Sequence, residues 1–268
     1  MTLWLVGLVV VAAIALIALV MSRGGGNDAS QATTPGTTQV LFIEGLRRSE
    51  MARILQEKTG IPEASYMTAT GPGARGRALA GTSRPTSLEG FLFPATYPVN
   101  PKAPVGNVVD YQLRTFRERT AGIDYAYARR HNLTKYDVLT IASLVEREAS
   151  DERERRIIAG IIYTRLHLKM RLDIDATVQY VVGYWKRDLT AADLRIASPY
   201  NTRRYTGLPP GPICNPGEAS IRAAANPIRT NDLYYVARAD GTDHHYFART
   251  PAEFYAAIAK AKANAAAG

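Results

Sequence analysis

Cysteine and histidine are both scarce in this chain of 268 residues. Cys214 is the single cysteine, so an internal disulfide is excluded and cysteine usage does not report the compartment. The four histidines include no HExxH motif, and the adjacent His244 and His245 should point to opposite faces of a strand, where they could not easily share one ion. We therefore expect neither a metal ion nor another cofactor.

Signatures of other common classes are missing too. No GxSxG motif is present, and Cys214 lies in a proline-rich loop without an activating signature, which argues against a serine or cysteine hydrolase. No RNP motif, zinc-finger spacing or basic region with heptads is present, so we expect no nucleic acid as a partner. The formal net charge is nevertheless +9, from 33 Lys and Arg against 24 Asp and Glu. This balance favours anionic surroundings, such as phospholipid head groups or anionic wall polymers.

The segment 2–21, TLWLVGLVVVAAIALIALVM, contains no charged residue. Its length matches the roughly 20 apolar residues that cross the hydrocarbon core of a bilayer. The apolar region of a signal peptide is shorter, about 7–15 residues, and follows basic residues, which are absent here. Residues 1–21 are therefore predicted to be a retained single-pass membrane anchor. Charge leaves its orientation open, because Arg23 follows the span and no basic residue precedes it.

The rest of the chain predicts a mixed α+β fold. Residues 22–39 are rich in Gly, Ser and Thr and are expected to form a flexible linker. Residues 40–85 are expected to form a small unit that is not stable alone, and residues 86–268 carry one dense series of elements that we predict to be the main domain. The unit consists of a strand over 40–46, a helix over 48–60 ending at Gly60, and a loop over 71–85. The main domain should contain helices over 107–123, 134–149, 152–170 and 251–267 and a β-hairpin over 233–240 and 244–250.

Two glutamates end the helix expected over 134–149, which opens with the capping-box pattern of Thr134 and Asp137. On a helical wheel, Glu146 lies on one flank of the apolar arc and Glu148 lies on the other, while Arg147 points directly away. Burial against apolar surface raises the pKa of a carboxyl group and keeps a proton available near neutrality. Either glutamate could be an acid on this ground, or both could simply mark the rim of the buried face.

Five motifs occur in an order that resembles the YceG family of endolytic murein transglycosylases, across roughly residues 40–260. These motifs are LEGFLFPATY (88–97), ASLVEREA (142–149), LDIDATVQY (172–180), SPYNT with GLPPGPICNPG (198–217), and LYYVA with HHYFART (233–250). The resemblance implies that Glu146, the first glutamate of the second motif, is the catalytic acid. It also implies a plasma-membrane anchor with the catalytic domain outside the cytoplasm, glycan strands of peptidoglycan as the substrate, and peptidoglycan synthases as partners.

The resemblance implies a reaction that needs only one carboxyl group, where most glycosidases need two. Glu146 would protonate the oxygen of the β-1,4 bond between N-acetylmuramic acid and N-acetylglucosamine. The resulting carboxylate would then take the proton of the C6 hydroxyl, leaving a 1,6-anhydro-N-acetylmuramic acid end without consuming water. Such acid–base assistance contributes about 10²–10⁴-fold.

The sequence departs from the family in its N-terminal half. Family members usually carry a fuller LysM-like region before the catalytic domain, whereas only VLFIEGLRRSEMARIL within 40–85 resembles the later part of that region. Independent glycan binding by this truncated LysM-like region is therefore in doubt. Cys214 also stands where a small residue is common, a change that we expect to be tolerated.

Weaker candidates for substrate binding come from residue chemistry alone. Glu89 can serve the site or cap a backbone N–H, with Gly90 allowing a close turn. Asp175 and Thr177 should share one side of an extended DIDAT segment, together with Asp173, and one of them could orient Glu146 or bind sugar.

The segment SPYNT offers two more candidates. Asn201 can bond an N-acetyl or hydroxyl group, or it can brace the turn after Pro199. Tyr200 can stack on a sugar ring or pack in the core. The stiff loop GLPPGPICNPG is expected to form one wall of the glycan groove.

A non-catalytic, membrane-tethered peptidoglycan-binding or scaffold protein is the alternative. It would explain the anchor, the positive charge and the LysM-like remnant. It would not explain the acidic motif and the polar loops.

Overall fold

A computed structural model describes residues 36–72, 74, 87–149, 151–185 and 188–267. The predicted anchor over 1–21, most of the linker over 22–39 and most of the loop over 71–85 lie outside these ranges. Among the described helices, none has the length and hydropathy needed to cross a bilayer.

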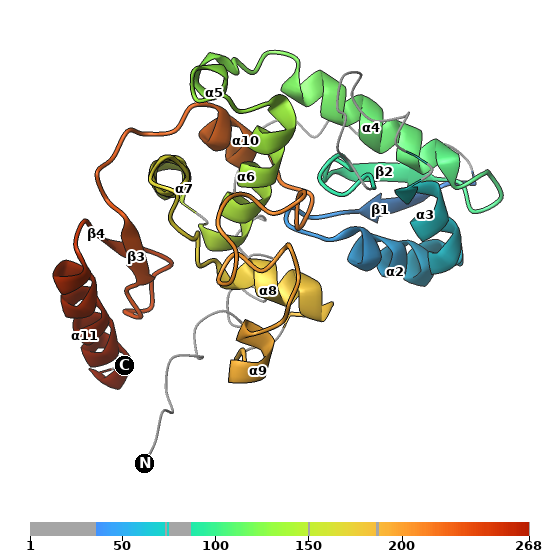
Figure 1. The fold of residues 1–268 in the computed structure, drawn as a ribbon. Helices are drawn as coiled ribbons and strands as arrows, with labels where there is room; N and C mark the ends of the chain where they lie inside the picture. Colours follow the sequence, from blue (N-terminus) through green and yellow to red (C-terminus); the bar gives the residue numbers. More distant parts are fainter. Residues whose placement is uncertain (1–35, 73, 75–86, 150, 186–187, 268) are drawn as a thin grey trace, which may run out of the picture.

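Helices dominate the described chain, and two small antiparallel sheets lie at opposite ends of the molecule (Figure 1). This arrangement confirms the predicted mixed α+β fold. The elements are β1 (Thr38–Leu41), α2 (Arg48–Thr59), α3 (Glu63–Ala69), β2 (Thr96–Val99), α4 (Gly106–Thr120), α5 (Ala126–Arg130), α6 (Lys135–Glu148), α7 (Glu152–His167), α8 (Asp175–Val182), α9 (Ala191–Leu194), α10 (Glu218–Ala225), β3 (Tyr234–Ala237), β4 (His245–Ala248) and α11 (Pro251–Ala267).

The first sheet joins segments that are far apart in the sequence. β1 pairs with β2, so that Thr38 is opposite Val99 and Leu41 is opposite Thr96. The helices α2, α3 and α4 surround this strand pair (Figure 1). Val40 and Tyr97 are buried in the core that continues into the rest of the molecule. The predicted division at residues 85 and 86 thus runs between two paired strands, and the domain boundaries stay a prediction.

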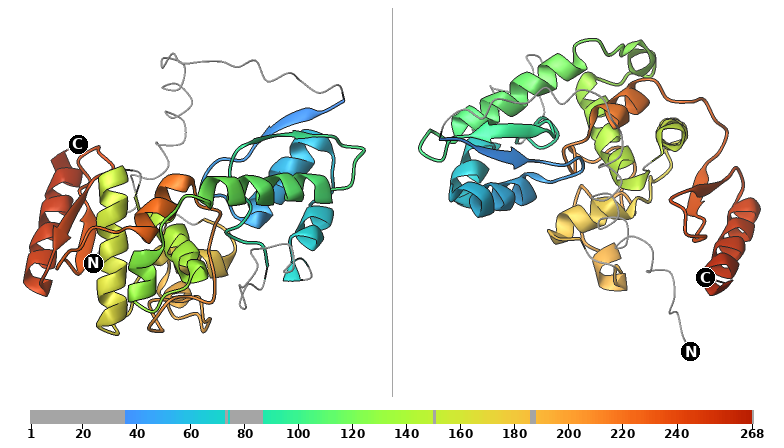
Figure 2. Two further views of the ribbon diagram at one scale, coloured as in Figure 1. Left: turned by 90° about the horizontal axis from the view of Figure 1, so that it is seen from above. Right: turned by 180° about the vertical axis from the view of Figure 1, so that it is seen from behind.

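The centre of the molecule is α6, which packs against α7 and α10 in every view (Figures 1 and 2). Its capping box forms as predicted, with Thr134 and Asp137 bonded to each other's backbone N–H. All residues from Val138 to Val145 are buried, so the predicted apolar arc extends around the whole helix. A helix buried on all sides is held in place by its neighbours, and its C-terminal end is therefore a firm support for side chains.

The segment LDIDATVQY corrects the prediction of an extended DIDAT. Asp173 has a positive φ of 54°, and α8 begins at Asp175 and ends at Val182, followed by Gly183, whose φ of 92° is left-handed. Successive residues of a helix are turned by about 100°, so Asp175 and Thr177 point to different sides instead of sharing one. An acidic residue in the first turn of a helix is favourable, which explains why the helix begins here.

The C-terminal hairpin and helix form as predicted. Tyr234 of β3 is opposite Ala248 of β4, and Asp240 and Gly241 lie in the connecting turn. The ring of Tyr234 stacks on Phe254 of α11, at 5.1 Å between centroids. The hairpin lies between α7 and α11, and α11 forms the edge of the molecule (Figure 1).

His244 lies before β4 rather than within it. The two adjacent histidines therefore do not point to opposite faces as expected. Their Nδ1 atoms both reach the buried carboxyl group of Glu154, at 3.3 Å from His244 and 2.8 Å from His245.

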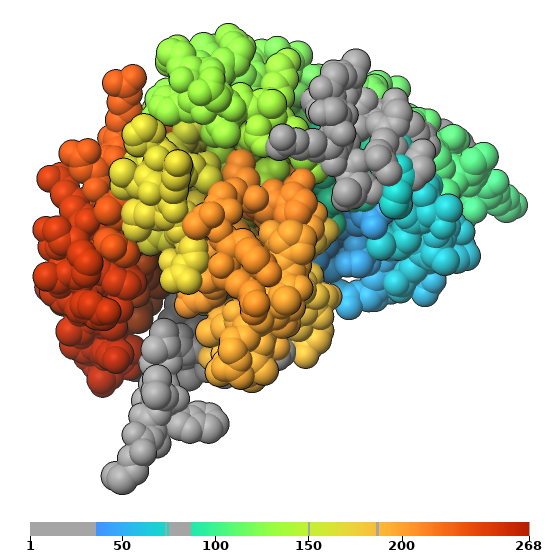
Figure 3. Space-filling model, in the orientation of Figure 1, coloured from blue at the N-terminus to red at the C-terminus, as the bar shows by residue number. Residues whose placement is uncertain are grey.

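The long segment between α9 and α10 crosses one face of the molecule between α7 and α2 (Figure 3). It contains SPYNT and the proline-rich loop. Its last part, residues 211–217, runs inward, where all seven residues are buried and Ile213, Cys214 and Asn215 have no exposed surface. This segment brings the fourth motif to the C-terminal end of α6.

Candidate active site

Three segments meet at Glu146, two residues before the end of α6. The Oε2 atom of Glu146 accepts a hydrogen bond of 3.1 Å from the N–H of Gly217, which directly precedes α10. From the turn between β1 and α2, Gly45 lies so close that a Cβ there would be 3.7 Å from the Cγ of Glu146. Gly45 has a φ of +79°, which glycine adopts without strain. Glu146 remains partly exposed, so its carboxyl group is both held and reachable.

Asn215 holds these segments together and was not singled out from the sequence. Its Oδ1 accepts from the N–H groups of Gly90 and Leu92, at 2.8 and 3.0 Å. Its Nδ2 donates to the carbonyl oxygen of Leu46 at 3.0 Å and to Glu89 at 2.9 Å. The side chain is completely buried, and both donors and both acceptor positions are used. The sequence did hold a signal for Asn215, because it is a polar residue inside a motif that is otherwise apolar and rich in proline.

Glu89 acts as a cap between segments. Its Oε1 accepts from the N–H of Arg48, the first residue of α2, at 2.9 Å, as well as from Asn215. Burial raises the pKa of Glu89 to about 7, although Arg48 and Arg47 favour its charged form. Because Glu89 is only 6% exposed and turned toward the N-terminus of α2, its geometry fits the backbone cap better than a contact with substrate.

Glu148 and Glu146 are contacted by different segments of the chain. The hydroxyl of Tyr235 on β3 donates to its Oε2 at 2.9 Å. Burial raises the pKa of Glu148 to about 7, and the nearby Asp175 adds to this rise, while Arg147 and Arg203 oppose it. The two glutamates are thus not equivalent, because the proline-rich loop contacts one and the C-terminal hairpin contacts the other.

Arg147 does not point away into solvent, which corrects the prediction from the helical wheel. Its guanidinium lies 3.9 Å from the ring centroid of Trp185, and that of Arg47 lies 3.7 Å from the same centroid. Two guanidinium groups this close to one centroid must occupy opposite faces of the ring. The indole N–H donates to Glu50 at 2.8 Å. The segment after α8 therefore covers this side of α6, which periodicity in α6 alone could not show.

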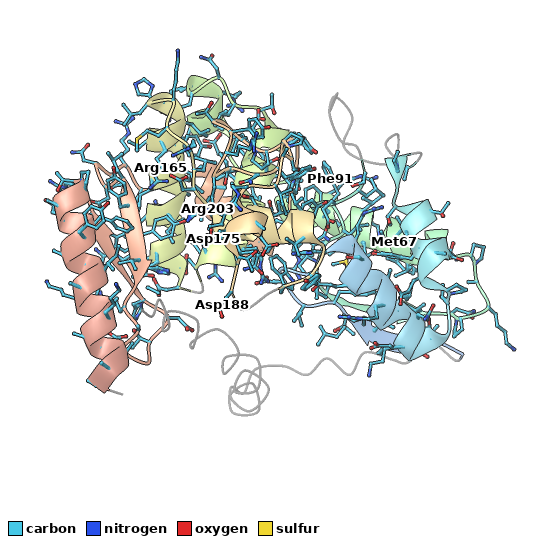
Figure 4. The ribbon with its side chains drawn as sticks, turned by 60° about the horizontal axis from the view of Figure 1, so that its bottom comes forward. Met67, Phe91, Arg165, Asp175, Asp188 and Arg203 are labelled. Carbon is cyan, nitrogen blue, oxygen red and sulfur yellow. The ribbon has the colours of Figure 1, made fainter. Side chains whose placement is uncertain are left out.

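Asp175 lies close to the second glutamate rather than to the first. It pairs with Arg203, at 3.1 Å between the Nε and Oδ1 atoms, and the two residues lie next to each other in Figure 4. Burial raises the pKa of Asp175, and Arg203 counteracts the rise. Asp175 contributes to the surroundings of Glu148, and the hydrogen bonds of Glu146 do not include it.

Thr177 and Asn201 are fully buried and serve the fold. The hydroxyl of Thr177 bonds the carbonyl oxygen of Ile174 at 2.7 Å and the hydroxyl of Thr202 at 3.0 Å. The amide of Asn201 donates to the carbonyl oxygens of Leu194 and Ile196, at 3.0 and 2.9 Å. With these groups already engaged, neither side chain is directed at a glycan in this structure.

Tyr200 lines a small pocket of about 370 Å³ together with Arg48, Glu89 and Tyr180. Its ring packs against Tyr180 at 4.9 Å between centroids. It is half-buried, so a stacking surface for a sugar ring is still present there.

A carboxyl group that is partly exposed, held by a backbone N–H and fixed at the end of a buried helix has the geometry of a general acid–base site. The chain belongs to the YceG-like family, whose model matches residues 19–260.

Relatives with known names support this membership. An endolytic murein transglycosylase from Bacillus subtilis (strain 168) is 39% identical over 155 residues, which cover 58% of this chain and 43% of that protein. An endolytic murein transglycosylase from Streptococcus pneumoniae (strain ATCC BAA-255 / R6) is 32% identical over 219 residues, covering 77% of this chain and 38% of that protein. The chain thus spans less than half the length of these relatives.

The fold is also that of a solved structure. A protein from Listeria monocytogenes described as YceG-like superposes with a TM-score of 0.71 at 29% sequence identity. The match covers 83% of this chain and 76% of that one. Most of the chain therefore shares its fold with a solved structure.

Proposed function

We propose that this chain is an endolytic peptidoglycan lytic transglycosylase. It cleaves the β-1,4 bond between N-acetylmuramic acid and N-acetylglucosamine, leaves 1,6-anhydro-N-acetylmuramic acid ends, and so terminates glycan strands during cell-wall assembly. The observation that carries the proposal is the position of Glu146. The residue that the family motif assigns as the acid is partly exposed and lies where three segments meet.

The geometry suits both halves of the reaction. A glycan bound over Glu146 would exclude water from its carboxyl group, and burial favours the neutral form that donates a proton to the bond oxygen. When the C1–O bond breaks, the proton moves to the departing oxygen and Glu146 becomes a carboxylate. The N–H of Gly217, at 3.1 Å, stabilises this carboxylate at the N-terminus of α10. The carboxylate then accepts the proton of the C6 hydroxyl as the new C6–O–C1 bond forms.

The uncharged span supports a location for this activity. We propose that residues 2–21 anchor the chain in the plasma membrane as a single-pass helix, with the catalytic region outside the cytoplasm. We expect peptidoglycan synthases as partners at this location. The full-length chain should stay in the membrane fraction after an alkaline carbonate wash. Protease added from outside should reach the C-terminal region, whereas release of soluble protein by cleavage near residue 21 would contradict the anchor.

Digestion of purified peptidoglycan tests the activity. The full chain, kept in solution with detergent, is incubated with intact sacculi, and mass spectrometry of the released fragments is used to find anhydro ends. The proposal predicts anhydro ends within long fragments. A protein that sediments with the sacculi but releases no anhydro-ended fragment would instead be a binding or scaffold protein.

A further inference from the structure

The turn between β1 and α2 brings a second carboxyl group, Glu44, to the site. A Cβ placed on Gly217 would overlap the carboxyl group of Glu44, so this carboxyl group packs directly on the Cα of Gly217. The N–H of the same glycine donates to Glu146. Gly217 has an ordinary φ of −74°, which any residue adopts, so glycine is needed here for space rather than for backbone conformation. Glu44 and Glu146 therefore both contact Gly217.

Two arginines and one neutral thiol lie around this pair. Partial burial raises the pKa of Glu44, the charge of Glu146 raises it further, and Arg155 of α7 lowers it. The Nε of Arg155 is buried without a hydrogen-bond partner among the described residues. Arg147 adjoins the turn, because a Cβ on Gly45 would lie 3.1 Å from its Nη1. The thiol of Cys214, from the proline-rich loop, stays neutral because burial raises its pKa well above the usual value.

We propose that Glu44 is a positioning residue that forms a pair with Glu146, in which the two carboxyl groups share one proton. Two neighbouring carboxyl groups resist losing both protons, so the pair holds one proton to a higher pH than a single carboxyl group would. This inference rests on the proposed function. In the reaction Glu146 donates its proton to the bond oxygen and regains one from the C6 hydroxyl, and Glu44 does not contact the reacting atoms. The family motif around Glu146 does not include Glu44.

The dependence of rate on pH tests this role, because a purely structural residue would change the rate equally at all pH values. Glu44→Gln reduces the pair to one carboxyl group, so the site should lose its proton at lower pH. We expect a rate near that of the unchanged protein at pH 5.5 and an about tenfold loss at pH 8. Arg155→Gln removes the opposing charge and should move the alkaline limb of the profile to higher pH. Glu57→Gln, the same chemical change on the exposed face of α2, should leave the profile unchanged.

A titration that needs no activity separates this inference from the proposed function. Carbon-13 NMR of the glutamate carboxyl carbons follows Glu44 in the full chain, with its signal assigned by its loss in Glu44→Gln. In Glu146→Gln the titration midpoint of Glu44 should fall, because the charge that raises it has gone. If the unchanged protein makes no anhydro ends, the proposed function fails, and this titration still decides whether the two carboxyl groups interact. An unchanged midpoint, or superimposable pH profiles for Glu44→Gln and the unchanged protein, would overturn the inference.

Discussion

Replacing Asn215 by alanine should destabilise the protein by about 2–6 kcal/mol. The side chain makes four hydrogen bonds to nitrogen and oxygen atoms, but two of these partners keep another one. The carbonyl oxygen of Leu46 still accepts from the backbone N–H of residue 215 at 2.8 Å, and Glu89 still accepts from Arg48. The N–H groups of Gly90 and Leu92 lose the partner they have. Each buried donor left without a partner costs about 1–3 kcal/mol, which gives the range for two of them.

The loss should be measured by denaturant unfolding followed by circular dichroism. Asn100→Ala is a matched control, because Asn100 bonds one backbone N–H in an exposed turn and should lose less than about 1 kcal/mol. Asn215→Asp sharpens the test. It keeps the acceptor for both N–H groups but turns an oxygen toward Glu89, so it should cost more at pH 8 than at pH 5, where Glu89 is protonated. A loss below about 1 kcal/mol for Asn215→Ala would refute the claim that this side chain holds the site together.

Three further predictions concern carboxyl groups and metal. Because the pKa of Glu89 is raised from 4.5 to about 7, the folded chain holds a proton there that the unfolded chain has lost. The contribution of Glu89 to stability should therefore be greatest below pH 4.5 and fall by about 1–3 kcal/mol as the pH rises through 7, and unfolding curves of Glu89→Gln should show a flatter dependence on pH. Glu148→Gln should keep much of its activity and lose about 1 kcal/mol of stability, because the amide oxygen can still accept from Tyr235; complete inactivity of the folded variant would refute this. Activity should survive EDTA, and a loss that zinc restores would rule out the mechanism with a single carboxyl group.

Local patterns predicted the helices well where the signal lies within a few residues. The capping box at Thr134 and Asp137 and the left-handed Gly60 both form, because a cap depends only on neighbouring backbone groups. The same kind of reasoning failed at Asp175, which begins α8 instead of lying in an extended segment. An alternating pattern over five residues is too short to separate a strand from the first turn of a helix.

The site is formed by contacts between segments that are distant in the chain, and local sequence patterns could not predict these contacts. Periodicity in α6 treated Glu146 and Glu148 as equivalent, and only the loop and the hairpin that cover the two residues distinguish them. Asn215 lies 125 residues from Gly90 in the chain, and no periodicity in either segment relates them. Glu44 was missed for the same reason, because its proposed role depends on its contact with Gly217, which belongs to a distant segment.

The most direct test of the account is Glu146→Gln in the full chain. Glutamine is nearly isosteric and can still accept from the N–H of Gly217, but it has no carboxyl proton to donate. Thermal unfolding should show a melting temperature close to that of the unchanged protein, with Glu57→Gln as the control for the same chemical change at an exposed position. Mass spectrometry of digested peptidoglycan should then find no anhydro ends from Glu146→Gln and normal amounts from Glu57→Gln. Anhydro ends formed by folded Glu146→Gln at the rate of the unchanged protein would contradict the assignment and make Glu148 or Glu89 the leading acid.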